Sequence, residues 1–122
     1  MVKSRAIFLD RDGTINKEVN HLSSHKQFEL INGVGEAISK INKSGILAVV
    51  VTNQPVVARG ELKESDLKII HNKMDTLLGK EGAYVDRIYY CPHHPDKGFV
   101  GEVISLKYNC DLSIKAHIHL YN

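Results

Sequence analysis

Two short apolar runs and one mixed segment predict three β-strands. Residues 6–9 and 46–51 are almost wholly apolar, as expected for strands without a solvated face. Residues 86–90, "DRIYY", are predicted to form the third strand, which leads into a cysteine. The polar stretch of residues 13–32 is expected to form a turn and a loop.

Two segments between these predicted strands carry apolar residues at helical spacing. Residues 33–44 and 64–78 are therefore predicted to be helices, ended by Gly45 and Gly79 respectively. Their apolar positions are Val34, Ala37, Ile38 and Ile41 in the first, and Leu67, Ile70, Met74, Leu77 and Leu78 in the second.

The order strand, helix, strand, helix, strand predicts an α/β fold, a parallel sheet with right-handed crossovers and helices on its faces. Ligands of such open sheets bind beyond the carboxyl ends of the strands. Asp10 and Asp12 follow the first strand, Thr52 follows the second and Cys91 the third. The chemically distinctive residues are thus expected on one rim.

Composition limits the classes of protein that need to be considered. The chain has 122 residues, 43% of them hydrophobic and 25% charged, which favours one ordinary globular domain. Its net charge of +2 is too small to argue for nucleic acid but suits an anionic small substrate. No segment is long and apolar enough to predict a membrane helix or a signal sequence, so we expect a cytoplasmic protein.

The stretch "IFLDRDGT" brings two carboxylates to the end of the first predicted strand. Residues i and i+2 of an extended chain project to the same side, so Asp10 and Asp12 can share one reacting centre. One acid can act as a nucleophile and the other can exchange a proton with the leaving group. Paired acids also attract a hard cation such as Mg²⁺, and Gly13 permits a sharp turn. The alternative is a turn in which the aspartates only cap the backbone.

Other polar residues on the rim have both a functional and an ordinary interpretation. Thr52 and Asn53 suit phosphate oxygens, although Thr-Asn also occurs in simple turns. Arg59 can hold an anionic group bidentately or can be an exposed arginine ahead of a helix. The two cysteines, Cys91 and Cys110, could form one disulfide, and a cytosolic chain favours a metal or redox role instead.

Three segments together, "FLDRDGTIN", "VVVTNQPVVARGE" and "IYYCPHHPDKG", resemble the haloacid dehalogenase (HAD) superfamily. More narrowly, they resemble its D-glycero-D-manno-heptose 1,7-bisphosphate phosphatases and histidinol-phosphatases. The similarity spans roughly residues 5–111. It implies a HAD-like Rossmannoid parallel sheet with flanking helices and without a large cap domain, which fits the short connections.

The resemblance also implies a role for each matched residue. Asp10 would attack phosphorus and form an aspartyl-phosphate, and Asp12 would protonate the leaving oxygen and then activate water. Mg²⁺ would be held by the Asp10 carboxylate and the Asp12 backbone carbonyl, and Thr52 would steady the phosphoryl group. Arg59 remains the candidate for a second anionic group. The remaining substrate contacts would come from Glu18, Val19, Asn20, His21, Asn53 and Gln54.

The family's structural zinc loop is matched only in part. Cys91 and His93 match its first pair of ligands and Cys110 matches the third, but Leu112 stands where the fourth cysteine is expected. A tetrahedral zinc site needs four ligands. The fourth could come from one of the further histidines, namely His94, His117 or His119. The alternative is two cysteines that bind no metal.

Beyond Asp111 the resemblance ends. The family continues with a lysine that neutralises the phosphoryl group and an acid that completes the Mg²⁺ site, whereas here Lys115 is at best a displaced lysine and no later acid follows. We therefore expect residues 1–111 to form an incomplete phosphatase core and residues 112–122 to form a divergent tail, in a chain truncated relative to the family. Only part of the set of charged groups that stabilises the phosphoryl group during its transfer would then be present.

The missing segment would pair with the open side of the first strand, so residues 6–9 are expected to form an uncovered apolar edge. The alternating residues 116–121 could lie along that edge, or two copies of the chain could pair through it as a homodimer. The expected activity is removal of the 7-phosphate from heptose 1,7-bisphosphate. The alternatives are a histidinol-phosphate phosphatase and a non-catalytic module that binds a phosphosugar.

Overall fold

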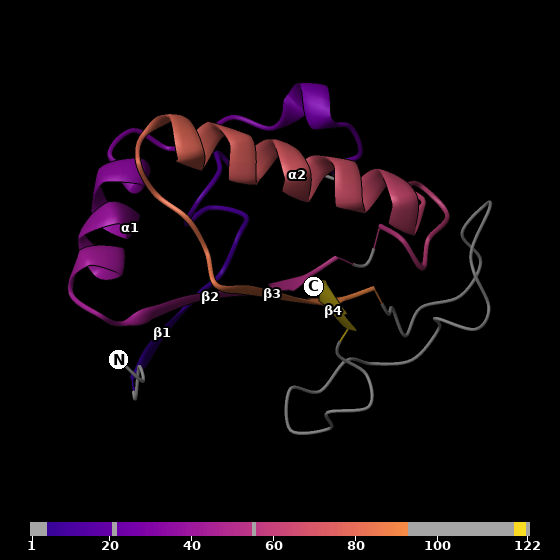
Figure 1. Ribbon diagram of the computed structural model, residues 1–122. Coiled ribbons are helices and arrows are strands. Elements are labelled where there is room, and N and C mark those ends of the chain that lie inside the picture. Colours follow the sequence, from indigo (N-terminus) through magenta and orange to yellow (C-terminus); the bar gives the residue numbers. More distant parts are fainter. Residues whose placement is uncertain (1–4, 21, 55, 93–118, 122) are drawn as a thin grey trace.

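The computed structural model describes residues 5–20, 22–54, 56–92 and 119–121, and these form an α/β layer (Figure 1). Its sheet has the strand order β1-β2-β3-β4. The strands are β1 (Ala6–Leu9), β2 (Leu47–Asn53), β3 (Arg87–Cys91) and β4 (His119–Tyr121). The helices are the short 3₁₀ helix η1 (His25–Gln27), α1 (Val34–Lys43) and α2 (Glu64–Lys80).

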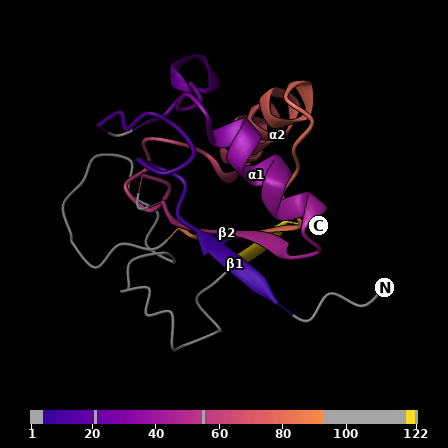
Figure 2. The same ribbon diagram turned by 90° about the vertical axis from the view of Figure 1, so that its left-hand side faces the viewer.

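The first three strands are parallel and neighbour each other in chain order. Each step from one strand to the next therefore goes in the same direction across the sheet. Right-handed crossovers then place both intervening helices on the same face. Figures 1 and 2 show α1 and α2 together above this face. The predicted parallel sheet with flanking helices is confirmed.

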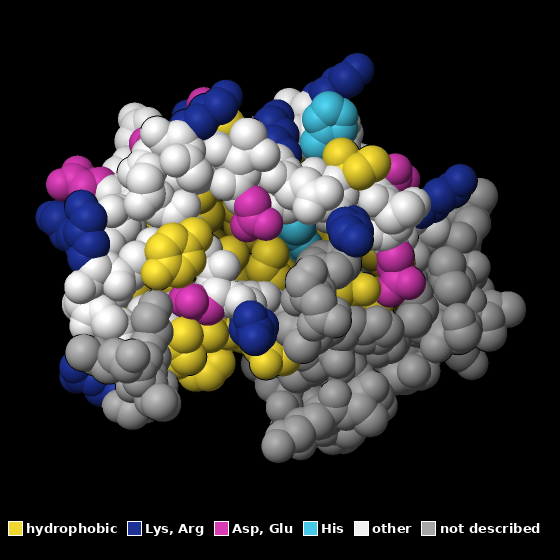
Figure 3. All heavy atoms as spheres, viewed as in Figure 1, with side chains coloured by type: hydrophobic (Ala, Val, Ile, Leu, Met, Phe, Trp, Pro, Cys, Tyr) yellow, Lys and Arg dark blue, Asp and Glu magenta, His cyan; other side chains and the backbone are white. Residues whose placement is uncertain are grey.

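The core lies between this face and the two helices. The register aligns Leu9 with Val50 and Val50 with Ile88, so these side chains form one row across the sheet. The apolar stripe of α2 that covers the row is fully buried and consists of Leu67, Ile70, Met74 and Leu78. In Figure 3, hydrophobic side chains show between α2 and the sheet, and Lys and Arg side chains are scattered over the surface around them.

The ends of α2 and β2 lie two residues beyond the sequence-based expectation, whereas the other helix and strand bounds agree with it within one residue. Gly79 does not end α2, which continues to Lys80 and is capped at Glu81. The left-handed residue after the helix is Gly82, with φ of 74°, and it provides the positive φ that ends a helix. Strand β2 extends two residues beyond the predicted limit and includes Thr52 and Asn53.

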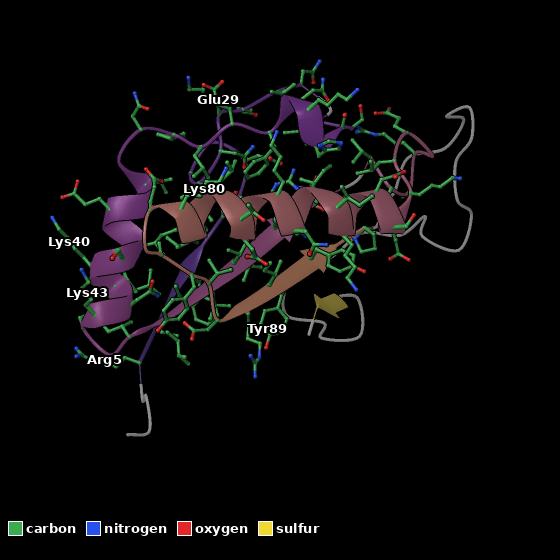
Figure 4. The ribbon with its side chains drawn as sticks, turned by 45° about the horizontal axis from the view of Figure 1, so that its top comes forward. Arg5, Glu29, Lys40, Lys43, Lys80 and Tyr89 are labelled. Carbon is green, nitrogen blue, oxygen red and sulfur yellow. The ribbon has the colours of Figure 1, made fainter. Side chains whose placement is uncertain are left out.

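The opposite face of the sheet has no helix among the described residues. Phe8 on this face is 69% exposed, and Ile7 on the same edge strand is 37% exposed, so the predicted uncovered apolar edge is confirmed. Tyr89 projects from β3 on the side away from α2 (Figure 4). Strand β4 pairs antiparallel with β3, at the other edge of the sheet. The expectation that the tail lies along β1 was wrong, because β3 provides the pairing edge that β4 uses.

No helix in the described part of the chain is both long and apolar enough to span a bilayer.

Candidate active site

The segment after β1 folds into a compact turn around one carbonyl group. The carbonyl oxygen of Arg11 accepts hydrogen bonds from the N–H groups of Thr14, Ile15 and Asn16, at 3.1, 2.8 and 3.2 Å. Gly13 has a φ of 82°, a left-handed conformation that residues with a Cβ rarely adopt. Ile15 is fully buried and anchors the turn in the core. The glycine expected after the aspartates therefore does permit the sharp turn.

The Asp12 carboxylate in this turn accepts four side-chain hydrogen bonds. Its Oδ1 accepts from Arg11 Nε at 3.0 Å, from Arg11 Nη2 at 2.8 Å and from Asn16 Nδ2 at 3.0 Å. Its Oδ2 accepts from Gln54 Nε2 at 2.9 Å. Burial alone would raise the pKa of Asp12, but the Arg11 charge and the bonds from Asn16, Gln54 and Arg11 together hold it below 3.8. Asp12 is therefore ionised near neutral pH.

Gln54 connects the end of β2 to the turn after β1. Its amide nitrogen donates to Asp12 Oδ2 and also to Thr52 Oγ1, the latter at 2.8 Å. Gln54 and Thr52 are each 3% exposed. An ionised carboxylate can only accept hydrogen bonds, so the contact with Asp12 fixes the amide's orientation. Thr52 is thus connected to Asp12 by way of Gln54, which donates a hydrogen bond to each of them.

Asp12 and most of the predicted substrate residues line one open hollow of about 180 Å³. From the sequence-predicted set it contains Asp12, Glu18, Val19, Asn20, Asn53, Gln54 and Arg59, to which the structure adds Leu22 and Val56. Asp10 does not belong to this lining. It is exposed directly after β1, and its Oδ1 accepts the Arg11 backbone N–H at 2.7 Å.

The loop after β2 is attached to the end of β3. The Gln54 N–H donates to the Cys91 carbonyl at 2.7 Å, and the Ala58 N–H donates to the Pro92 carbonyl at 3.1 Å. Arg59 follows directly and is half-buried. The ends of β1, β2 and β3 are therefore linked by hydrogen bonds, as expected for a binding rim at the carboxyl ends of parallel strands.

The remaining predicted site residues lie outside the described part of the chain, namely His21, His93 and Cys110. Cys91 is buried at the end of β3 and is disulfide-bonded, so the structure has the disulfide that the sequence analysis considered less favourable than a metal or redox role. The same residues contain no group of three or more His, Cys, Asp or Glu side chains that could hold a metal ion. The zinc site therefore stays a prediction.

A magnesium ion would require fewer protein ligands than a structural zinc ion does. Mg²⁺ usually keeps several water molecules and is bound through one or two carboxylates. Asp10 is exposed, and within the described residues only its Oδ1 accepts a hydrogen bond. Its second oxygen is available as a hard anionic ligand, and so the donors present fit this ion.

Sequence reasoning missed three residues of the site: Arg11, Asn16 and His71. Arg11 is fully buried, Asn16 is fully buried, and His71 is 2% exposed. Arg11 stands between the two aspartates in the quoted motif, and the alternation of an extended chain would have placed it on the opposite, inward side. No local signal predicts His71, because it comes from α2 and meets Arg11 only in the fold.

Proteins similar to this chain share its fold and a common activity. D-glycero-β-D-manno-heptose-1,7-bisphosphate 7-phosphatase from Escherichia coli (strain K12) is 39% identical over 124 residues, which cover 94% of this chain and 63% of that protein. Its counterpart from Salmonella typhi is 42% identical over 106 residues, covering 87% of this chain and 54% of that protein. No family model matches the chain.

Two solved structures have the same arrangement of elements. D,D-heptose 1,7-bisphosphate phosphatase from B. bronchiseptica, complexed with magnesium and phosphate, has a TM-score of 0.72 and 34% identity, covering 80% of this chain and 55% of that one. A protein from Mesorhizobium loti assigned as a HAD-like phosphatase has a TM-score of 0.79 and 34% identity, covering 93% of this chain and 52% of that one.

The fold is that of the HAD-like phosphatases. Within that superfamily the chain is similar to D-glycero-D-manno-heptose 1,7-bisphosphate phosphatases, as the resemblance had indicated. The chain spans about half to two thirds of the length of the relatives it matches.

Proposed function

We propose that this chain is a phosphomonoesterase that removes the 7-phosphate of D-glycero-D-manno-heptose 1,7-bisphosphate. The observation that carries the proposal is the hollow beyond the strand ends. There Asp12 lies beside the exposed polar residues Glu18, Asn20 and Asn53 and beside the half-buried Arg59. This combination suits a hydroxylated, anionic substrate. The names of the similar proteins favour a heptose bisphosphate over histidinol phosphate.

In the first half of the proposed reaction, an Asp10 carboxylate oxygen attacks phosphorus. The phosphorus–oxygen bond to the sugar breaks as Asp12 transfers a proton to the leaving oxygen, which yields an aspartyl-phosphate and the free hydroxyl group. The negative charge of the bound substrate beside Asp12 favours the protonated carboxyl that this step needs. Thr52, tied to Asp12 through Gln54, supplies a hydroxyl near the phosphoryl oxygens.

In the second half, Asp12 takes a proton from water as that water attacks phosphorus. The bond from phosphorus to Asp10 breaks, inorganic phosphate leaves and the Asp10 carboxylate is restored. When bound, Mg²⁺ offsets the repulsion between the carboxylates and the phosphoryl oxygens. The Asp10 carboxylate and the Asp12 backbone carbonyl would hold it.

Several accompanying assignments are part of the same proposal. The chain would act in the cytoplasm, where a phosphorylated sugar is found. Residues 1–111 would form the phosphatase core and residues 112–122 a separate tail. His21 would join the sugar contacts, and zinc would be held in a structural role by Cys91, His93 and Cys110 once the disulfide of Cys91 is reduced.

The deciding experiment is Mg²⁺-dependent phosphate release by the 122-residue chain from heptose 1,7-bisphosphate and from histidinol phosphate. Asp10→Asn serves as the test variant, and Asp66→Asn on α2 serves as its matched control. We expect turnover of the heptose substrate, its loss in Asp10→Asn and its retention in Asp66→Asn. Turnover of histidinol phosphate alone would correct the substrate. Folded protein without turnover would indicate a module that binds phosphosugar without hydrolysing it.

A further inference from the structure

Arg11 is an unusual residue for the centre of a small domain, because its side chain is charged and fully buried. A buried charge is strongly unfavourable unless it is paired and its hydrogen-bonding groups are satisfied. Arg11 is paired with Asp12: its Nε and Nη2 both donate to the same oxygen, Oδ1, at 3.0 and 2.8 Å. The guanidinium plane therefore fixes one edge of this carboxylate.

His71 holds the other end of the guanidinium. Arg11 Nη1 lies 3.1 Å from His71 Nε2, and the two residues are sixty positions apart in the chain. A guanidinium group has donors only, so Nε2 must accept, and the ring proton must be on Nδ1. Burial, together with the positive charge of Arg11, lowers the pKa of His71 to about 3, against a smaller opposing effect of Asp12. The ring is consequently neutral, as the acceptor role requires.

The two oxygens of Asp12 are left in different states. Oδ1 already accepts three hydrogen bonds, from Arg11 Nε, Arg11 Nη2 and Asn16 Nδ2, which leaves it little further capacity. Oδ2 accepts one, from Gln54, a residue that lines the hollow together with Asp12. Proton exchange with a molecule in the hollow therefore falls to Oδ2.

We infer that Arg11 and His71 are positioning residues, which orient Asp12 so that Oδ2 exchanges the proton with the leaving oxygen of the substrate. The inference rests on the proposed function. Neither residue touches the substrate. Arg11 acts through its bonds to Oδ1, and His71 acts through Arg11 by anchoring it to α2. The acid is thereby tied to the helix layer as well as to the turn that carries it.

The test compares two substitutions of His71. Glutamine places an amide oxygen near the position of Nε2 and keeps an acceptor for Arg11, whereas leucine keeps the volume and removes the acceptor. Each variant is assayed on heptose 1,7-bisphosphate and on p-nitrophenyl phosphate. The second substrate releases a stable phenolate that departs without a proton. Its kcat/KM covers only the steps up to phenolate release, before Asp12 acts as a base on water, so it reports on attack by Asp10 but not on proton exchange by Asp12.

With the sugar phosphate, we expect His71→Leu to lower kcat by ~10- to 100-fold with little change in KM, since a misplaced catalytic group loses rate rather than binding. With p-nitrophenyl phosphate, the loss in kcat/KM should stay below ~3-fold, because no acid is needed up to release of the phenolate. His71→Gln should restore most of the lost kcat. Equal losses in kcat/KM on both substrates, no loss in His71→Leu, or no restoration by glutamine would overturn the inference.

Nitrogen-15 NMR of the labelled chain gives a readout that needs no turnover. We expect His71 to have a protonated Nδ1 and an unprotonated Nε2 at neutral pH. A ring protonated on Nε2, or on both nitrogens, would overturn the inference while leaving the proposed function intact. An unsubstituted chain that releases no phosphate from either substrate would overturn the proposed function itself, and the two failures are thus distinguishable.

Discussion

The side-chain amide of Gln54 donates a hydrogen bond to Oδ2 of Asp12 at 2.9 Å, across the junction between the ends of β1 and β2. The same nitrogen donates to Thr52 Oγ1. We expect Gln54→Leu to lower kcat by at least ~10-fold, because a preorganised donor is lost from the reacting carboxylate. Stability should fall by about 1–3 kcal/mol, because one buried acceptor, Thr52 Oγ1, and one partly buried acceptor, Asp12 Oδ2, lose their donor. Steady-state kinetics and urea unfolding measure the two effects.

Gln54→Glu is the comparison that separates shape from charge. It preserves the side-chain volume but faces Asp12 with a second carboxylate, which raises the pKa of both acids through like-charge repulsion. We expect it to impair turnover at neutral pH more than leucine does. A glutamate variant with unchanged kcat would show that the Gln54 contact does not serve catalysis.

His71 predicts an acid-sensitive fold. Its pKa in the folded chain is about 3, below the ordinary value of 6.5. Between these two values the histidine is protonated in the unfolded chain and neutral in the folded chain. Stability should therefore decrease as the pH falls, by up to about 1.4 kcal/mol per pH unit between pH 6 and 4. Urea unfolding across this range gives the slope, and His71→Gln should flatten it.

Two acids with shifted pKa values also contribute to the dependence of stability on pH, in opposite directions. Burial raises the pKa of Asp75, so its protonation slightly favours the fold at low pH. Asp12, with its lowered pKa, loses its stabilising interactions only below about pH 3.8, outside the window of His71. A pH slope that is the same in His71→Gln as in the unsubstituted chain would contradict the assignment.

The open edge of β1 predicts self-association. If two β1 strands pair antiparallel with Ala6 opposite Leu9, the same register places Arg5 of one copy opposite Asp10 of the other, which adds an attraction between opposite charges. Phe8→Lys should abolish a dimer seen by light scattering, because a charge on an edge strand opposes pairing. Ile69→Lys, at an equally apolar position on α2 that is 47% exposed, should leave it intact. A chain that stays monomeric at all concentrations would exclude the homodimer.

Cys91 allows the metal and disulfide alternatives to be separated. If zinc is bound, elemental analysis should find about one zinc ion per chain, and Cys91→Ser should lose it. A chelator should then release the metal and expose two reactive thiols. If the cysteines form a disulfide instead, only a reductant will expose them, and a chelator will have no effect.

The periodic parts of the chain were predicted well, because burial of a strand or of one helix face leaves its signature in the local sequence. Strand β1 was placed at its observed residues 6–9, and α2 was found from its apolar stripe. The end of α2 was misplaced at Gly79, since that glycine lies on the exposed side and only Gly82 has the left-handed backbone. Local sequence does not distinguish these two glycines.

Of the candidate site, the residues at strand ends were predicted and the residues that join them were not. Asp12 and Asn53 were expected near each other because parallel strands bring their carboxyl ends to one rim, and both line the hollow. The contact of Arg11 with His71 depends on how α2 packs over the sheet, and a separation of sixty residues leaves no periodic signal. Such polar contacts emerge only when the layers are assembled.

The attachment of the loop after β2 to the end of β3 determines which changes in sequence this site can absorb. Gln54 and Ala58 take their backbone partners from Cys91 and Pro92, and main-chain bonds do not depend on the identity of the side chain. Substitutions within the loop should therefore leave this attachment intact, although Gln54 and the buried Val56, Val57 and Ala58 are constrained by their own side-chain contacts. An insertion or deletion of one residue within β3 should not, because it would displace Gln54 from Asp12 without altering any residue of the hollow. The evolutionary constraint on this site thus extends to the length of a strand that contributes no side chain to it.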